Sequence, residues 1–102
     1  MKKPKVICLC GSTRFYQTFA DENLRLTLLG FIVLSIGCNT KSDTSLHLNR
    51  RTKLMLDELH KRKIDLSDSI LILNVNGYIG KSTRSEIDYA ISIGCPVRYL
   101  ES

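Results

Sequence analysis

Short apolar runs alternate with longer amphipathic segments along the chain. The runs apolar enough to be strands are the segments 5–10, 31–35, 69–75 and 97–100. Between them, apolar residues at helical spacing predict helices over 13–29, 45–63 and 83–93. Strands that alternate with helices in this way are typical of βα units around a parallel sheet. We therefore expect an α/β fold: a three-layer Rossmann- or flavodoxin-like domain with a four- to five-stranded, mainly parallel sheet.

The strand candidates differ in how apolar they are, and this predicts their order. Segment 69–75 (SILILNV) is apolar enough to be buried on both faces, so we expect it and segment 5–10 to be the central strands. Each helix should face the sheet with apolar residues at helical spacing. These residues are Phe15, Phe19, Leu26 and Leu29 in the first helix, Leu48, Thr52, Met55 and Leu59 in the second, and Ile87, Ala90 and Ile91 in the third. Gly30 and Gly94 should end the first and third helices.

Size and composition indicate one domain over residues 1–102. This length suffices for one core and not for two, and 43% hydrophobic with 25% charged residues is ordinary for a globular protein. There is no run of about 20 apolar residues, so no membrane span is expected. The apolar run after Lys5 is too short for a signal peptide. We therefore expect a cytoplasmic protein.

The four cysteines, Cys8, Cys10, Cys38 and Cys95, do not follow the spacing of metal ligands. Cys8 and Cys10 lie inside an apolar strand segment, where alternate residues point to opposite faces of the sheet. We interpret them as small buried apolar residues rather than as a disulfide or a zinc site. The sequence therefore indicates no metal and no cofactor.

The net charge of +5 comes largely from two basic clusters. The clusters are Lys2, Lys3 and Lys5, and Arg50, Arg51, Lys53, Lys61, Arg62 and Lys63. Nucleic-acid binders have such clusters, but no aromatic residue is interleaved with these charges, and the second cluster falls on a predicted helix. A solvated helix face is the simpler interpretation, and attraction of an anionic ligand is the alternative. Nucleic acid is the least favoured partner.

Ligands of open α/β sheets bind outside the carboxyl ends of the strands, and this chain has polar loops there. The segment Gly11-Ser12-Thr13-Arg14 follows the first strand and opens the first helix. Its backbone N–H groups and the helix dipole can bind an anion, to which Ser12 and Thr13 add hydroxyl groups and Arg14 a bidentate guanidinium. The competing interpretation is an ordinary helix N-cap with a surface arginine.

The loop after the third strand carries a Gly-Lys-Ser sequence (80–82) and leads into the third helix. A P-loop needs a glycine five positions before Gly80, where Val75 stands, so no ATPase is predicted. Thr83 and Glu86 fit a capping box, in which the glutamate only satisfies a backbone N–H. Alternatively, the Glu86 carboxylate faces the ligand crevice, where it can act as a nucleophile at C1′ of a ribose.

Two segments resemble a known family. Residues 10–14 (CGSTR) and 80–90 (GKSTRSEIDYA) are similar to the nucleoside 2-deoxyribosyltransferase superfamily, most closely to its short members, and also resemble the 2′-deoxynucleoside 5′-phosphate N-hydrolases. The resemblance implies a flavodoxin- or Rossmann-like fold, homo-oligomers, and cleavage or exchange of the N-glycosidic bond through the glutamate matched by Glu86. The residues that it implies as contacts of phosphate or sugar are Ser12, Arg14 and Ser82.

The base-handling part of the site departs from the family pattern. The family often has a carboxylate where this chain has His60, eight residues before Asp68. A histidine can protonate a leaving base because its pKa lies near neutrality. Alternatively, His60 is a solvent-facing helix residue and Asp57 acts in its place. The family's acidic residue after the third strand is also missing, and Tyr78 in that loop can stack on a base or pack over its own helix.

Two functions are consistent with these residues. The first is an enzyme that cleaves or transfers at the N-glycosidic bond of a (deoxy)nucleoside or nucleotide, with Glu86 as nucleophile and His60 assisting the base. Its substrate-binding residues would be Gly11, Ser12, Thr13, Arg14, Gly80, Ser82 and Tyr78. The second is a non-catalytic nucleotide-binding module, such as a sensor or a sequestering protein. A sheet this small leaves one side of the crevice open, so we also expect a homo-oligomer in which a second copy covers it.

Overall fold

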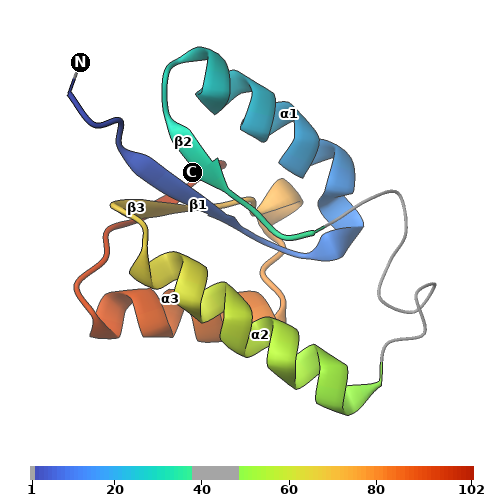
Figure 1. Cartoon of the computed structure of the whole chain (residues 1–102). Coiled ribbons are helices and arrows are strands. Elements are labelled where there is room, and N and C mark those ends of the chain that lie inside the picture. The colour runs from blue at the N-terminus through green and yellow to red at the C-terminus, as the bar shows by residue number, and fades with distance from the viewer. Residues whose placement is uncertain (1, 38–48) are drawn as a thin grey trace.

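The chain folds around a parallel sheet, as the alternating pattern predicts. The computed structural model describes residues 2–37 and 49–102. In this part of the chain the strands are β1 (Val6–Cys10), β2 (Ile32–Leu34), β3 (Ser69–Ile72) and β4 (Val97–Tyr99). They form one sheet in the order β2-β1-β3-β4, and all neighbouring pairs are parallel (Figure 1). The α/β fold and the central positions of β1 and β3 are confirmed, in a Rossmann- or flavodoxin-like layout.

Helices cover both faces of the sheet and give the expected three layers. α1 (Tyr16–Leu28) lies on one face, whereas α2 (Arg50–Asp65) and α3 (Lys81–Ser92) lie on the other (Figure 1). Successive residues of β1 and β3 alternate between the two faces, so each face has its own apolar core. The core under α1 consists of Leu9, Phe19, Leu26, Leu71 and Leu73. The core under α2 and α3 consists of Cys8, Cys10, Ile64, Ile70, Ile72, Ile87, Ala90 and Cys95.

Local backbone chemistry determines where the helices begin and end. Gly30, as predicted, ends α1: its φ of +93° lies in the left-handed region, and the Phe31 N–H returns to the Leu26 carbonyl at 3.1 Å. α2 begins after Asn49, whose side-chain oxygen accepts a hydrogen bond from the Thr52 N–H at 2.8 Å. None of the helices in the two described ranges is long and apolar enough to cross a membrane.

The helix faces agree with the periodicity in α1 and α3 except at two exposed positions and at Phe15, a half-buried residue that precedes α1 and belongs to neither apolar core. Leu29 is 63% exposed, because α1 ends one residue before it. Ile91 is 64% exposed, because the buried stripe of α3 runs through Ile87 and Ala90, and the next residue is turned about 100° around the helix. Both were predicted to face the sheet, and both predictions are wrong.

The predicted face of α2 is wrong over most of its length. Met55 and Leu59 are about half exposed, and the buried side chains are His60 and Ile64. Leu59 lines a cavity at the edge of the sheet instead of packing on the strands, so the apolar stripe there is not a core stripe. The predicted start of this helix, with Leu48, lies outside the described residues, as does Cys38.

Candidate functional site

A cavity of about 410 Å³ opens at the carboxyl edge of the sheet, where the ligand loops are expected. The loop after β1, the first turns of α3 and one side of α2 form its wall. All of the site residues predicted from the sequence line it except Arg14: Gly11, Ser12, Thr13, His60, Tyr78, Gly80, Ser82 and Glu86. The fold therefore brings together side chains from three distant segments of the chain.

The loop after β1 passes close to the end of β3 and leads into a short 3₁₀ turn, Thr13–Phe15. A Cβ atom on Gly11 would lie 3.2 Å from the Leu73 Cβ, which is tighter than most side-chain contacts, so a larger residue here would require Leu73 to shift by a few tenths of an ångström. The Ser12 Oγ accepts a hydrogen bond from the Arg14 N–H at 3.3 Å and caps the turn. The N-cap interpretation of Ser12 is confirmed, and its contact with an anion stays a prediction.

Arg14 and Tyr78 lie together at the rim of the cavity. Arg14 is exposed, and its guanidinium carbon lies 4.2 Å from the centroid of the Tyr78 ring. The same ring packs edge-on against Phe15, with ring centroids 5.9 Å apart. These contacts join the loop after β3 to the loop after β1, so Tyr78 holds the two ligand loops together.

α3 begins two residues earlier than predicted, and this changes the role of Glu86. Gly80 is the N-cap residue, in an extended conformation with φ −78° and ψ 176°, and no side chain caps this end. Since Lys81 is the first residue of the helix, Thr83 is the third and is itself buried. A capping box between Thr83 and Glu86 is therefore wrong. Glu86 is 7% exposed, and its side chain lines the cavity.

Burial sets the protonation of Glu86. It raises the pKa of this carboxyl group to about 7, against the opposing effect of His60. The His60 Nε2 lies 3.9 Å from the Glu86 Oε1. Burial acts to lower the pKa of His60, but its contacts with Cys8 and Glu86 raise that pKa above the ordinary value. The Glu86 carboxylate thus favours the protonated form of His60, and protonated His60 favours the ionised form of Glu86. Both side chains are buried in the cavity wall.

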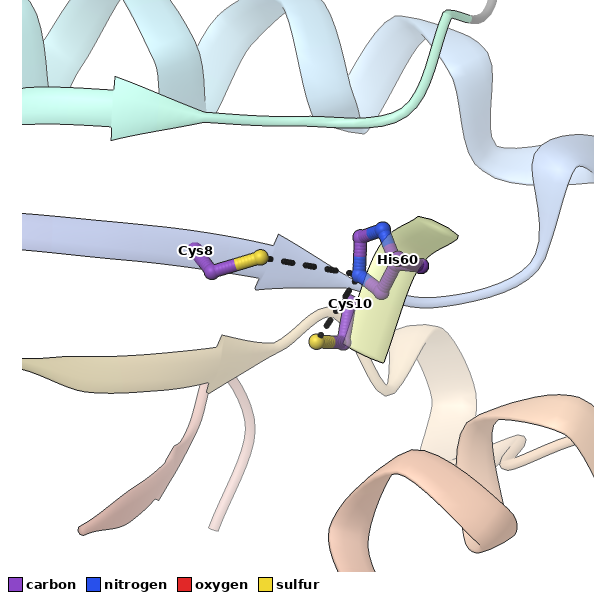
Figure 2. Close-up of side chains that lie close together, drawn as sticks. All are labelled: Cys8, Cys10 and His60. Atoms are coloured by element: carbon purple, nitrogen blue, oxygen red, sulfur yellow. Dashed lines mark hydrogen bonds between the residues drawn. The ribbon is translucent and has the colours of Figure 1, made fainter. Parts of the chain in front are cut away.

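His60 also contacts two thiols of β1 (Figure 2). Its Nε2 lies 3.5 Å from the Cys8 Sγ and 3.3 Å from the Cys10 Sγ. The two cysteines share a face because they are two residues apart on a strand, and α2 places His60 over that face. All three side chains are buried. Within the described residues, the Nδ1 of His60 has no hydrogen-bond partner.

The buried cluster changes two interpretations made from the sequence. Cys8 and Cys10 are buried free thiols, as predicted, but they contact a polar ring and are more than apolar filling. The solvent-facing interpretation of His60 is wrong, because the register of α2 turns it towards the sheet, where it is 3% exposed. The only feature of the sequence that indicated this cluster was the Cys-x-Cys spacing on a strand, which places both thiols on one face of the sheet. The imidazole comes from 50 residues beyond Cys10, a separation that no motif predicts.

Asp57, the alternative to His60, lies at the same wall. It is half-buried and lines the cavity, together with Ser82 and Glu86. A smaller hollow of about 250 Å³ has the same three residues in its lining. They therefore lie between this hollow and the main cavity. Both candidates for handling a base therefore lie beside Glu86.

The loop after β3 is held by the carboxyl-terminal residues. The Asn74 amide donates to the Glu101 carbonyl and accepts from the Glu101 N–H, both at 2.9 Å. The Glu101 carboxylate accepts from the N–H of Asn76, at 3.1 Å to each oxygen. Asn74 is thereby engaged within the fold and is not available to a ligand through these two atoms.

Comparison of the chain with protein-family models, with curated proteins and with solved structures finds no match.

Proposed function

We propose that this protein cleaves or transfers at the N-glycosidic bond of a nucleoside or nucleotide, with Glu86 as the nucleophile. The observation that carries the proposal is a buried carboxyl group at the wall of a ligand-sized cavity. Glu86 is 7% exposed and lines a cavity of about 410 Å³. Small-molecule sites typically measure roughly 300–1,000 Å³. The cavity also lies at the carboxyl edge of the strands, where open parallel sheets bind nucleotides.

The reaction proceeds in two steps through the ionised form of Glu86. A carboxylate oxygen attacks C1′ of the sugar, the bond from C1′ to the base nitrogen breaks, and its electron pair leaves with the base. The base takes up a proton, for which His60 and Asp57 are the candidates at the cavity wall. Water or a second base then attacks C1′ and releases the carboxylate, which gives hydrolysis or transfer.

The two loops at the cavity are suited to hold the rest of the substrate. Ser12 and Thr13 present hydroxyl groups at the end of β1, and Ser82 does so in the first turn of α3. The backbone N–H groups at the start of α3 add a partial positive charge that favours phosphate or a sugar oxygen. The Tyr78 ring at the rim offers a stacking surface for a base.

The Arg14→Ala variant is expected to bind 5′-nucleotides about 10- to 100-fold more weakly, because a charge-assisted contact with phosphate is lost. Binding of the corresponding nucleosides should hardly change. Calorimetric titration with a nucleoside and its 5′-phosphate measures the difference, and Arg98→Ala, at an exposed arginine of β4, is the control. An equal loss for both ligands would exclude a phosphate role for Arg14.

A second copy of the chain has a surface to bind beside the cavity. On α2, Leu54, Met55 and Leu56 are 56%, 53% and 40% exposed, and Leu56 also lines the cavity. Packing of a second copy there buries these side chains and closes the open side of the site. We expect a dimer by light scattering and a monomer for Leu54→Glu. Leu24→Glu, at a residue of α1 that is 60% exposed, should remain dimeric. A monomeric wild type at high concentration would contradict this interface.

A further inference from the structure

Cys8, Cys10 and His60 bring three possible metal ligands to one point in the core. Both Sγ atoms and the Nε2 lie within 4.8 Å of one another, with the Nε2 3.5 Å and 3.3 Å from the two sulfurs (Figure 2). In a tetrahedral zinc site, bonds of about 2.3 Å to sulfur and about 2.0–2.1 Å to nitrogen separate a sulfur from a nitrogen by about 3.6 Å. The imidazole thus already lies at nearly the metal-bound separation from each of the two sulfurs.

Hydrogen bonding leaves one polar atom of this cluster without a partner in the described part of the chain. The Nε2 of His60 contacts both thiols, and its Nδ1 has no hydrogen-bond partner within the described residues. The Cys8 Sγ also approaches the Leu9 carbonyl, but at 3.8 Å this is a weak contact. Apolar side chains make up the surrounding core. A metal ion would engage all three polar side chains at once.

We propose that Cys8, Cys10 and His60 bind a zinc ion. Two thiolates and an imidazole favour Zn²⁺ over Mg²⁺ or Ca²⁺, which prefer oxygen ligands. On binding, the thiols give up their protons to solvent, and the two thiolates balance the charge of the ion. His60 lines the cavity, so the ion has a route from solvent to the cluster. Three protein ligands with one open position are typical of zinc sites that also bind water or a substrate.

Glu86 lies beside His60 at this cluster. The Glu86 Oε1 lies 3.9 Å from the His60 Nε2, compared with about 3.4 Å for an oxygen and a nitrogen bound to one zinc ion. The carboxylate thus lies near one ligand but outside the three-residue set. The zinc site itself does not rest on the proposed function.

The unpartnered Nδ1 of His60 sets the expected affinity. A zinc-bound histidine usually donates its other ring N–H to an oxygen, and the loss of such a partner costs about 10- to 100-fold in affinity. Since the Nδ1 has no partner within the described residues, we expect zinc to bind about 10- to 100-fold more weakly than at zinc sites with a complete outer shell.

Cobalt(II) titration of the metal-free 102-residue chain, without substrate, tests the zinc site. One equivalent should bind, with a thiolate-to-cobalt charge-transfer band in the near ultraviolet and the visible absorption of a tetrahedral ion, and zinc should displace it. The Cys38→Ser/Cys95→Ser double variant leaves Cys8 and Cys10 as the chain's remaining cysteines and should keep the full band. Cys95 makes a matched control because it is buried in the same core.

Variants of the ligands complete the test. His60→Ala and Cys8→Ser should each lower zinc affinity at least about 100-fold, since the loss of an outer-shell partner alone reaches that size. Circular dichroism verifies that each variant is folded, and if Cys8→Ser fails to fold, the double variant decides the role of the thiols. A folded wild type without the charge-transfer band would overturn the proposal, and so would a His60→Ala variant that retains it. Base release, measured separately on metal-free protein, is untouched by either result.

Discussion

The Glu86→Gln variant is expected to lose base release by at least about 10³-fold, because removal of a catalytic nucleophile commonly costs this much or more. Glutamine has nearly the same shape as glutamate, so it can occupy the wall of the cavity, but its amide cannot attack C1′ and form the glycosyl ester. Chromatography of a panel of nucleosides and 5′-nucleotides, incubated with each protein, measures the free base. Glu58→Gln is the matched control: it changes a glutamate of α2 whose side chain is 63% exposed.

The outcomes of this experiment separate the two functions considered. Release of base by the wild type and not by Glu86→Gln supports a glycosidic enzyme and identifies its substrate class. Full activity of Glu86→Gln would exclude the nucleophile mechanism. If no member of the panel loses its base while nucleotides still raise the melting temperature, the non-catalytic nucleotide-binding module becomes the better proposal.

The largest effect on stability is expected for Phe19→Ala. The Phe19 side chain is 1% exposed in the core between the sheet and α1. Truncation of such a buried ring typically lowers the free energy of unfolding by about 3–5 kcal/mol, compared with a total of about 5–15 kcal/mol for a domain. Urea denaturation measures the loss. Leu28→Ala, in the same helix but 76% exposed, should change stability by no more than about 0.5 kcal/mol.

Phe19 also supports the loop after β1. Its Cζ lies 3.5 Å from the place where a Cβ of Gly11 would be, so the ring packs directly under the start of that loop. We therefore expect Phe19→Ala to weaken nucleotide binding under conditions where it is still folded, whereas Leu28→Ala should bind normally. Similar unfolding midpoints for the two variants would show that this core contributes less than its burial indicates.

The strands and the site's location were predictable because their signals are local. The apolar runs at β1 and β3 are dense enough to require burial on both faces, which placed these strands at the centre of a parallel sheet. Gly30 ended α1 as expected, since a left-handed residue there stops the helix. Parallel strands have their carboxyl ends at one edge, so the loops after β1 and β3 had to meet.

The orientation of side chains at the site was not predictable in the same way. Helical periodicity indicates a helix, but which stripe is buried depends on what packs against it. In α2 this made His60 a core residue and left Met55 half exposed. α3 begins after Gly80 rather than at Thr83, so Glu86 lies beyond the first turn of the helix. There it cannot cap the helix, and its carboxyl group is buried.

The sequence by itself determined the α/β fold, the central strands and the edge at which ligands would bind, because apolar periodicity and glycine act over a few residues. Only the tertiary structure decided which polar groups meet at that edge. Cys8 and Cys10 reach His60, and His60 reaches Glu86, through the packing of α2 and α3 on one face of the sheet. These contacts join residues far apart in the chain, and no local pattern encodes such distances.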